Sequence, residues 1–404
     1  MAQAKCLIVT THYRPLIGGA LTVYDALASH ANGAVSVLTA SHDYVAEKEV
    51  EGWKSFDQMA SYKVTRLPFM RIGLLPAGVS VLGKIQAKIK AWKLSRKVLR
   101  ATLALIEADD IDVVCIGAQD ALGWLVEPLK QKTDAKVIIY VHGEEVSQGA
   151  HSPKAEEQRR TALQKADGVI AVSSFTADIL RNRYHVPKEK ILLQTNGVDL
   201  ARYNGHLAPS MREPMGLPQG RFVFSCGRLV ERKGFDMLVE AWPEIHMAVP
   251  DVTLVIGGSG PLELALKARI TTLGISDSVK MLGWMSEEKM AAAYGFADVF
   301  AMPNRTMPDG DTEGFGLVFL EAAAMGTPSV GGKAGGAVDA IVDGETGLFV
   351  DGNKPEKISA ALTELLTNKA LCDTLALKSQ AHAQTQGWQK KTDDFLAYLN
   401  QISS

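Results

Sequence analysis

Short apolar runs rich in β-branched residues alternate with longer segments of helical periodicity along most of the chain. The runs are almost continuously apolar, which is typical of parallel strands buried on both faces. In the first half they predict strands at Cys6–Thr10, Val35–Thr39, Asp112–Ile116, Val137–Val141, Val169–Val172 and Ile191–Gln194. The second half predicts strands at Phe222–Cys226, Thr253–Ile256, Val279–Leu282, Val299–Met302, Ser329–Val330 and Leu348–Val350.

The alternation stops between Asp199 and Gly220, where prolines, glycines and scattered polar residues predict a linker over residues 201–220. Two β/α units then predict two doubly wound, Rossmann-like α/β domains, at 1–200 and 221–384, with ligands at the carboxyl ends of their strands. A cleft between the domains is the expected active site. Residues 385–404 predict a C-terminal helix, for which packing back on the N-terminal domain is one option.

Composition narrows the class of protein. With 404 residues, 47% hydrophobic and 22% charged, the chain fits two or three globular domains and excludes a disordered or fibrous protein. The 43 basic and 45 acidic residues nearly cancel, so we expect no nucleic acid partner. Neither a signal peptide nor an apolar run of about 18 residues is evident, which favours a cytoplasmic protein. Four cysteines without metal or redox spacing favour a reducing compartment: Cys6, Cys115, Cys226 and Cys372.

A glycine pair, Gly18-Gly19, lies between the first strand and a helical pattern that starts at Ala20. Glycine lets the backbone approach an anion at a helix N-terminus. The segment is not GxGxxG, which argues against dinucleotide binding. A turn that needs glycine for steric reasons is the alternative, and the sequence leaves both open.

Two cations follow the first strand of the second half. Arg228 comes directly after that strand, and Lys233 lies at the start of the next helical pattern. Arginine offers a bidentate fork and lysine a point charge, a combination suited to a diphosphate. Two solvated loop cations are the alternative, but the flanking glycines at a strand-to-helix junction favour a functional pair.

Residues 311–326 contain two carboxylates of special interest. Glu321 is the only charged residue of an otherwise apolar helical stretch, and such a carboxylate is costly unless it is hydrogen-bonded, for example by ribose hydroxyls. Glu313 lies just before this helix, where the amides of Gly316 and Leu317 can donate to a sugar or a phosphate. The alternatives are a helix N-terminal charge at Glu313 and a basic partner for Glu321.

Two other glycine-rich segments have less specific patterns. Asp309-Gly310-Asp311 matches the DxD metal motif, but it lies in a glycine-rich loop before the first carboxylate, and we expect no bound metal. The segment from Gly257 to Pro261 could be a dinucleotide loop, but a tight strand-to-helix connection explains it equally well, since proline suits a first helical turn.

These motifs together resemble those of the retaining glycosyltransferases of family 4. The resemblance rests on the E-x7-E spacing of Glu313 and Glu321, preceded by GRLVERKG and followed by GTPSVGGKAGGAVDAIVDGETGLFV. It extends over nearly the whole chain, through Gly18-Gly19, His142-Gly143 and Asn196–Asp199. The MPNRT segment at 302–306 followed by EGFG is most similar to bacterial mannosyltransferases that act on lipid acceptors, such as the phosphatidylinositol mannosyltransferases.

The resemblance implies a GT-B fold, a nucleotide-diphosphate sugar donor and transfer with retention, without a required cofactor or metal. Arg228 and Lys233 would hold the diphosphate, Glu313 would bind the sugar, and His142 would lie near the sugar's 6-hydroxyl. The donor-binding set would be Gly18, Gly19, Gly258, Gly283, Trp284, Gly314, Phe315, Gly316, Leu317 and Glu321. The first domain would bind a lipid-linked or saccharide acceptor.

The segment Lys84–Arg100 carries five lysines, two arginines and no acidic residue, although the whole chain has a net charge of −2. Ile85, Ile89, Trp92 and Val98 give it a rough apolar helical face. A basic amphipathic helix with tryptophan is typical of peripheral contact with an anionic membrane. A solvated helix whose apolar face meets the domain core is the alternative.

The sequence therefore predicts a retaining, GT-B glycosyltransferase that moves a mannose- or glucose-type sugar. An epimerase or a glycogen-synthase-like polymerase on the same fold is one alternative, and a non-catalytic nucleotide-sugar binding protein is another. A dinucleotide dehydrogenase is disfavoured by the missing fingerprint. The base, the acceptor and the oligomeric state stay open.

Overall fold

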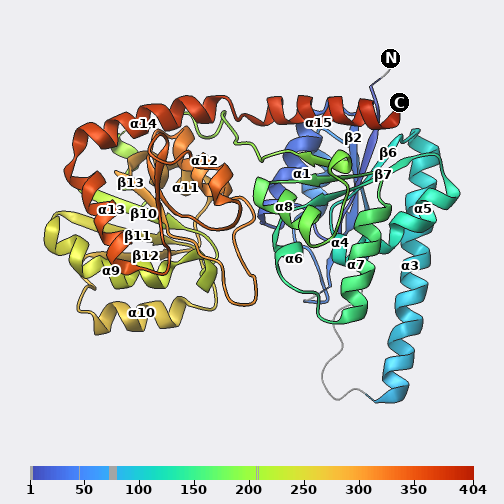
Figure 1. Cartoon of the computed structure of the whole chain (residues 1–404), viewed down its shortest axis with the longest axis horizontal. Coiled ribbons are helices and arrows are strands. Elements are labelled where there is room, and N and C mark those ends of the chain that lie inside the picture. The colour runs from blue at the N-terminus through green and yellow to red at the C-terminus, as the bar shows by residue number, and fades with distance from the viewer. Residues whose placement is uncertain (1–2, 45, 72–79, 206, 208) are drawn as a thin grey trace. The chain divides into compact units, whose positions relative to one another are not determined.

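The computed structural model describes residues 3–44, 46–71, 80–205, 207 and 209–404 (Figure 1). The chain divides into two compact units, each with its own parallel sheet. Unit 1 consists of Met1–Val172, Ala177–Gln194 and Trp388–Ser404, and unit 2 of Ser173–Thr176 and Thr195–Gly387. The two doubly wound α/β units confirm the predicted fold class.

Seven parallel strands form the sheet of unit 1, in the order β5-β2-β1-β6-β7-β8-β9. They are β1 (Cys6–Val9), β2 (Val35–Ala40), β5 (Val64–Leu67), β6 (Val113–Ile116), β7 (Lys136–Val141), β8 (Gly168–Ala171) and β9 (Ile191–Leu193). All six predicted strands are present. The edge strand β5 was not predicted, because its four residues are only partly buried and include Arg66, so they form no continuous apolar run. A short antiparallel pair, β3 (His42–Asp43) and β4 (Lys48–Glu49), lies outside this sheet.

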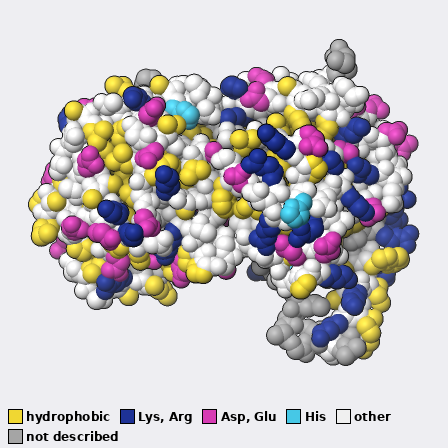
Figure 2. Space-filling model, viewed as in Figure 1, with side chains coloured by type: hydrophobic (Ala, Val, Ile, Leu, Met, Phe, Trp, Pro, Cys, Tyr) yellow, Lys and Arg dark blue, Asp and Glu magenta, His cyan; other side chains and the backbone are white. Residues whose placement is uncertain are grey.

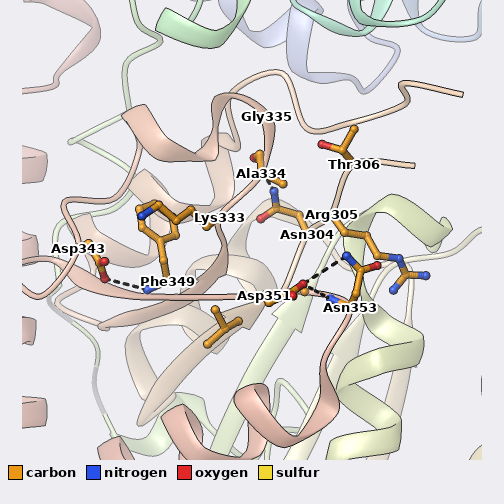
Figure 3. Close-up of a pocket in the computed structure, with 12 residues that line it drawn as sticks. Asn304, Arg305, Thr306, Lys333, Ala334, Gly335, Asp343, Phe349, Asp351 and Asn353 are labelled. Carbon is orange, nitrogen blue, oxygen red and sulfur yellow. Dashed lines mark hydrogen bonds between the residues drawn. The ribbon is translucent and has the colours of Figure 1, made fainter. Parts of the chain in front are cut away.

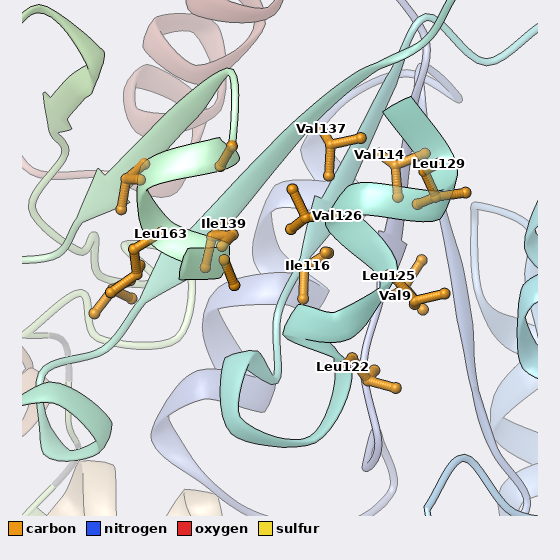
Figure 4. Close-up of a cluster of buried hydrophobic side chains, with 14 of the residues drawn as sticks. Val9, Val114, Ile116, Leu122, Leu125, Val126, Leu129, Val137, Ile139 and Leu163 are labelled. Atoms are coloured by element: carbon orange, nitrogen blue, oxygen red, sulfur yellow. The ribbon is translucent and has the colours of Figure 1, made fainter. Parts of the chain in front are cut away.

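Helices cover both faces of this sheet (Figure 1). They are α1 (Gly19–His30), α2 (Trp53–Met59), α3 (Val81–Asp109), α4 (Gln119–Leu122), α5 (Val126–Lys132), α6 (Glu144–Ser147), α7 (Pro153–Lys165), α8 (Ser174–Asn182) and α15 (Trp388–Ser403). Figure 4 shows part of the core, where Val114 of β6 lies beside Leu129 of α5 and Ile139 of β7 lies near Leu163 of α7. Such burial of aliphatic side chains provides the main favourable free energy of folding.

The C-terminal helix α15 belongs to unit 1, where it packs against α1. Its Tyr398 hydroxyl fills the space beside Gly168, so that a Cβ at this glycine would lie only 1.8 Å from the hydroxyl oxygen. Any larger residue at 168 would therefore push α15 away from the sheet.

Helix α3 does not carry the whole apolar face expected for it. Val98 is fully buried in the core of unit 1, whereas Ile85, Ile89 and Trp92 are exposed. Because a helix turns by about 100° per residue, Val98 lies on the opposite side of the helix from Ile89. Leu82 is exposed as well, and its spacing places it on the same side as Ile85, Ile89 and Trp92.

Unit 2 has six parallel strands in the order β12-β11-β10-β13-β14-β15. They are β10 (Arg221–Cys226), β11 (Val252–Gly257), β12 (Val279–Gly283), β13 (Val299–Met302), β14 (Ser329–Gly332) and β15 (Gly347–Val350), and all six were predicted. The helices are α9 (Phe235–Ala248), α10 (Glu263–Thr272), α11 (Glu287–Phe296), α12 (Leu317–Ala324), α13 (Pro355–Thr367) and α14 (Lys369–Gln384).

The predicted linker, 201–220, contains neither a strand nor an α-helix among its described residues, and residues 206 and 208 lie outside them. One 3₁₀ turn, Pro209–Met211, interrupts its irregular course. No described helix combines the length and the apolar character that crossing a membrane requires.

Candidate active site

The sheet of unit 2 changes its winding direction at β10, which has β11 on one side and β13 on the other. Ligands of doubly wound sheets bind outside the carboxyl ends of the strands at such a point. The loops there are closely packed: a Cβ on Gly258 would lie 1.9 Å from the carbonyl oxygen of Gly227. The amide of Gly258 also donates to the carbonyl of Gly283, at 2.6 Å. Gly258 therefore has a packing reason to be glycine, separate from its predicted contact with the donor.

Lys233 and Glu313, which are 80 residues apart in the sequence, form an ion pair beside the end of β10. The Lys233 ammonium donates to Oε2 of Glu313 at 2.7 Å, and both side chains are 12% exposed. Lys233 ends a 3₁₀ turn, Glu231–Lys233, and its aliphatic chain passes over Gly227. The next residue, Gly234, has a φ of 75°, and a Cβ there would lie 2.1 Å from the carbonyl oxygen of Pro303. The backbone beside Lys233 is therefore tightly packed, and this restricts the position of the Lys233 side chain.

Glu313 is an ionised acceptor at this site. Burial by itself raises the pKa of Glu313, but the charge of Lys233 and its hydrogen bond, with smaller effects from Arg232 and the Phe315 amide, bring the pKa below its ordinary value. The carbonyl of Glu313 accepts the amide of Gly336 at 2.7 Å. The first amides of α12 follow this carboxylate and have no partner within the helix. Glu313 and these amides offer both acceptors and donors to a polar ligand.

Glu321 on α12 has a partner that the sequence did not reveal. Tyr294 of α11 donates its hydroxyl proton to Oε2 of Glu321 at 2.8 Å, and the Cys226 thiol lies 3.0 Å from the same hydroxyl oxygen. Burial raises the pKa of Glu321, while the Tyr294 hydrogen bond and the charges of Arg202 and Lys233 oppose this rise. The partner is therefore a tyrosine, and the alternative of a basic partner is not what the structure shows.

Arg232, for which the sequence indicates no role, supports the loop that precedes Glu313. It is buried and its guanidinium approaches a carboxylate oxygen of Asp311 at 3.3 Å. The Asp311 amide in turn donates to the side chain of Asp309 at 3.0 Å. Within the described part of the chain, no cluster of three or more His, Cys, Asp or Glu residues is placed to hold a metal ion. In this structure Asp311 of the DxD-like segment therefore pairs with an arginine of its own unit.

The other predicted donor residues lie in the same loops. Gly316 has a φ of 88°, and a Cβ there would lie 2.7 Å from the ring of Phe319, so glycine is required. Gly314 and Phe315 are buried, whereas Trp284, directly after Gly283, is 67% exposed. Arg228 is exposed, and its side chain makes no hydrogen bond or ion pair with the described residues. Lys233, Glu313 and Glu321 are thus organised by protein contacts, and Arg228 is not.

A cavity of about 570 Å³ lies in unit 2 at the carboxyl ends of β13, β14 and β15 (Figure 3). Oδ1 of Asp343 accepts the amide of Phe349 at 3.0 Å, and Oδ1 of Asp351 accepts the amide of Asn353 at 3.0 Å. These carboxylates therefore stabilise the turns that shape its wall. None of the predicted site residues lines it.

In unit 1, Gly18 precedes α1 in extended backbone, with a φ of 174° that any residue adopts. A Cβ there would meet nothing closer than a Leu21 carbon at 3.5 Å. Neither backbone strain nor crowding requires glycine at this position, so the steric explanation for Gly18 does not hold. Gly19 begins the helix, where free amides are available to an anion.

His142 follows β7 and is held by two neighbouring elements. Its Nε2 lies 2.6 Å from the hydroxyl oxygen of Tyr24 on α1, and its amide donates to Oε1 of Glu145 at 2.7 Å. Burial lowers the pKa of His142 to about 3, so the imidazole is neutral throughout the physiological range. Burial likewise raises the pKa of Glu145 to about 7.

The two Rossmann-like units, with an acidic and basic cluster at the winding reversal of unit 2, define a GT-B glycosyltransferase. Solved structures agree on the fold: the chain is similar to Anabaena Alr3699/HepE, crystallised with UDP and glucose, with a TM-score of 0.76 and 20% identity over 98% of this chain and 100% of that one.

Family models and related sequences identify the family of this chain. Residues 17–202 match the family described as Glycosyltransferase Family 4, and 209–382 match Glycosyl transferases group 1. A GDP-mannose-dependent α-(1-6)-phosphatidylinositol monomannoside mannosyltransferase of Mycolicibacterium smegmatis is 32% identical over 96% of this chain and 95% of its own length. A D-inositol 3-phosphate glycosyltransferase of Arthrobacter is 32% identical over 60% of this chain and 58% of its own. The chain belongs to glycosyltransferase family 4 and is a glycosyltransferase, as the sequence motifs indicated.

Two functional neighbours were missed by sequence reasoning, Tyr294 beside Glu321 and Tyr24 beside His142. Neither tyrosine belongs to a motif with a recognisable spacing, and the sequence therefore assigns no role to either. The available signal was general: a buried tyrosine hydroxyl usually has a hydrogen-bond partner.

Proposed function

We propose that this protein is a retaining mannosyltransferase that takes GDP-mannose as its donor and an inositol-containing lipid as its acceptor. The observation that carries the proposal is the similarity over nearly the full length to the mycobacterial enzyme, whose name specifies that donor and a phosphatidylinositol mannoside. The inositol phosphate glycosyltransferase, whose name also specifies an inositol acceptor, supports the acceptor class.

In the proposed reaction, the acceptor hydroxyl oxygen bonds to the anomeric carbon on the face from which the diphosphate leaves. The bond between that carbon and the diphosphate oxygen breaks, and the hydroxyl proton passes to the departing diphosphate. Lys233 and Arg228 would stabilise the negative charge that develops there, which is a preorganised electrostatic contribution. Because these protein cations serve the diphosphate, the proposal includes no metal.

The two carboxylates would have separate roles in this reaction. Glu321, with Oε2 held by Tyr294, would accept the ribose hydroxyls through its second oxygen. Glu313 and the amides at the start of α12 would bind the transferred sugar. Gly18 and Gly19 would let the backbone of unit 1 approach the donor phosphates, and Trp284 with Gly283 would lie near the base. The protein would then contribute mainly positioning and charge stabilisation.

GDP-mannose is expected to stabilise the protein more than GDP-glucose, UDP-glucose or UDP-galactose do. A ligand in hundredfold excess over its Kd adds about 2.7 kcal/mol to the free energy of unfolding. The measurement is the unfolding temperature with each nucleotide sugar, followed by transfer of labelled mannose to vesicles that contain phosphatidylinositol mannosides. The proposal is contradicted if UDP-hexoses stabilise the protein and GDP-mannose does not. Labelled mannose on free inositol phosphate instead of the lipid would identify a soluble acceptor.

The surface of α3 supports a lipid rather than a soluble acceptor. Leu82, Ile85, Ile89 and Trp92 follow the 3-4-3 spacing that forms one helical stripe, and all four side chains are exposed. The basic side chains of Lys84–Arg100 lie around this stripe, and the guanidinium of Arg96 lies 4.7 Å from the centre of the Trp92 ring. Figure 2 shows hydrophobic and basic side chains together along the exposed end of this helix. An apolar stripe within a basic field fits an anionic lipid surface.

Wild-type protein is therefore expected to co-sediment with anionic vesicles at low salt and to dissociate at high salt. Each basic residue near an anionic leaflet contributes about 1 kcal/mol, which is screened within a Debye length. The variant Lys88/Lys90/Lys93→Glu should lose this binding, and Trp92→Ala should weaken it at all salt concentrations. The matched control, Lys280/Lys357/Lys378→Glu, makes the same charge change at exposed positions of unit 2 and should still bind. Equal recovery of wild type with neutral and anionic vesicles would contradict the proposal.

A further inference from the structure

The imidazole of His142 is enclosed by two tyrosine rings in unit 1. The Tyr140 ring is stacked on it, with centroids 5.1 Å apart and an interplanar angle of 20°. The Tyr24 ring meets it edge-on, with centroids also 5.1 Å apart. Tyr24 is 0% exposed and Tyr140 is 1% exposed, so both rings are fixed in the core. This packing determines the plane in which the two ring nitrogens of His142 lie.

Hydrogen bonding then determines which nitrogen carries the proton. The Tyr24 hydroxyl has a single proton, which it donates to the carbonyl oxygen of Gly117 at 2.7 Å. The same oxygen lies 2.6 Å from Nε2 of His142 and can only accept there, so Nε2 carries the imidazole proton. In the neutral ring, Nδ1 is then an acceptor. Among the described residues, Nδ1 makes no hydrogen bond.

Gly117 is part of the same arrangement. A Cβ at this position would lie 2.6 Å from Cζ of Tyr24 and 2.8 Å from its hydroxyl oxygen. Only glycine after β6 therefore allows Tyr24 to reach the Gly117 carbonyl. The sequence places a glycine, a buried tyrosine and a histidine on three elements so that their polar atoms form one chain.

The groups that face the imidazole do not supply a proton to it. Tyr24 and Tyr140 stay neutral, because burial raises the pKa of each hydroxyl far above the physiological range. Cys115 on β6, an electrostatic neighbour of both tyrosines, is likewise neutral, since burial raises the pKa of its thiol. Glu145 contacts the amide of His142, not its ring. Burial raises the pKa of Glu145 to about 7, so Glu145 is the group in this cluster that titrates near neutrality.

We propose that Tyr24 is a positioning residue that holds His142 as a neutral imidazole protonated on Nε2, so that Nδ1 accepts a hydrogen bond from a hydroxyl of the donor sugar. The proposal rests on the proposed function for the identity of the ligand, but the tautomer is a property of the protein alone. It assigns His142 the role of a hydrogen-bond acceptor and not that of a general acid. A sugar hydroxyl that donates to Nδ1 is fixed in orientation, which favours one geometry of the transferred group.

The tautomer is tested first, and without any activity measurement. In protein with isotope-labelled histidine nitrogens, the His142 signals are assigned by comparison with His142→Ala, and their chemical shifts distinguish protonated from unprotonated nitrogen. We expect a protonated Nε2 and an unprotonated Nδ1 across the neutral pH range. In Tyr24→Phe, which keeps the ring but removes the hydroxyl, the signals should show a mixture of both tautomers. A wild-type ring protonated on Nδ1 would overturn the proposal.

Kinetics then test the acceptor role of Nδ1. Tyr24→Phe is expected to lower kcat about 10-fold, the effect of one lost hydrogen bond, with little change in KM for the donor. A donor that lacks the 6-hydroxyl should react more slowly than the full donor with wild type, and this difference should shrink in Tyr24→Phe and vanish in His142→Ala. The control Tyr398→Phe removes the hydroxyl of a half-buried tyrosine of α15 elsewhere in unit 1 and should behave as wild type.

Two results would contradict the inference: a kcat of Tyr24→Phe equal to that of Tyr398→Phe, or an unchanged preference for the 6-hydroxyl in His142→Ala. Titration of Glu145 is the remaining source of a pH effect. In Glu145→Gln, any inflection of kcat near neutral pH should disappear, while the His142 tautomer stays the same. If no donor is transferred at all, the proposed function fails, whereas the tautomer measurement still decides the role of Tyr24.

Discussion

Replacing Lys233 by Ala is expected to lower kcat about 10²–10³-fold, as the removal of other preorganised electrostatic groups does. Lys233 is held by Glu313 at 2.7 Å in a largely buried setting, so its charge needs no reorganisation when negative charge develops on the leaving diphosphate. The same substitution leaves Glu313 buried without its partner, which costs about 3–5 kcal/mol of stability in comparable pairs. Steady-state kinetics and thermal unfolding on the same preparations measure both effects.

Two further variants separate the loss of turnover from the loss of stability. Lys233→Ala combined with Glu313→Gln removes the unpaired charge and should recover most of the unfolding temperature without recovering kcat. Arg228→Ala, at an exposed position without a protein partner, should lower kcat at an unchanged unfolding temperature. If both Arg228→Ala and a well-folded Lys233 variant turn over as wild type does, neither cation acts on the leaving group.

The parallel strands could be predicted because their residues are buried on both faces, and this produces apolar runs that stand out from the helices between them. The exception, β5, is an edge strand in which Arg66 forms a two-pronged ion pair with Asp57. The position of Arg66 in this strand depends on a partner nine residues away in the sequence and not on an apolar run within the strand.

The candidate site likewise contains residues that the sequence reveals and contacts that it does not. Gly316 and Gly258 are recognisable in the sequence because a positive φ or a close backbone approach excludes other residues. The contacts of Tyr294 with Glu321 and of Tyr24 with His142 are not recognisable, because they span 27 and 118 residues and depend on which elements pack together in the fold. Spacing within a motif predicts which residues face a ligand, whereas the side chains that orient those residues are determined by tertiary packing.

Glu321→Gln and Glu313→Gln are expected to impair the enzyme at different stages. Glu321→Gln removes a carboxylate that would accept the ribose hydroxyls, so the Kd for GDP should rise about 10–100-fold, in line with hydrogen bonds to charged groups. Glu313→Gln removes the partner of Lys233 and the carboxylate proposed to bind the sugar, so GDP affinity should change little while kcat falls about 10²-fold. Calorimetric titration with GDP and steady-state transfer rates measure the two quantities separately.

Tyr294→Phe provides the matched control for the assignment of Glu321. Burial raises the pKa of Glu321, and the Tyr294 hydroxyl opposes this rise together with the charges of Arg202 and Lys233, while Glu287 adds to it. Without the hydroxyl the pKa should rise further, so the carboxyl is protonated at a higher pH and GDP affinity is lost on acidification sooner than in wild type. Glu321→Gln cannot titrate at this position, and combining it with Tyr294→Phe should abolish the shift. Identical responses of GDP binding to Glu313→Gln and Glu321→Gln would show that the two carboxylates do not divide the donor between them.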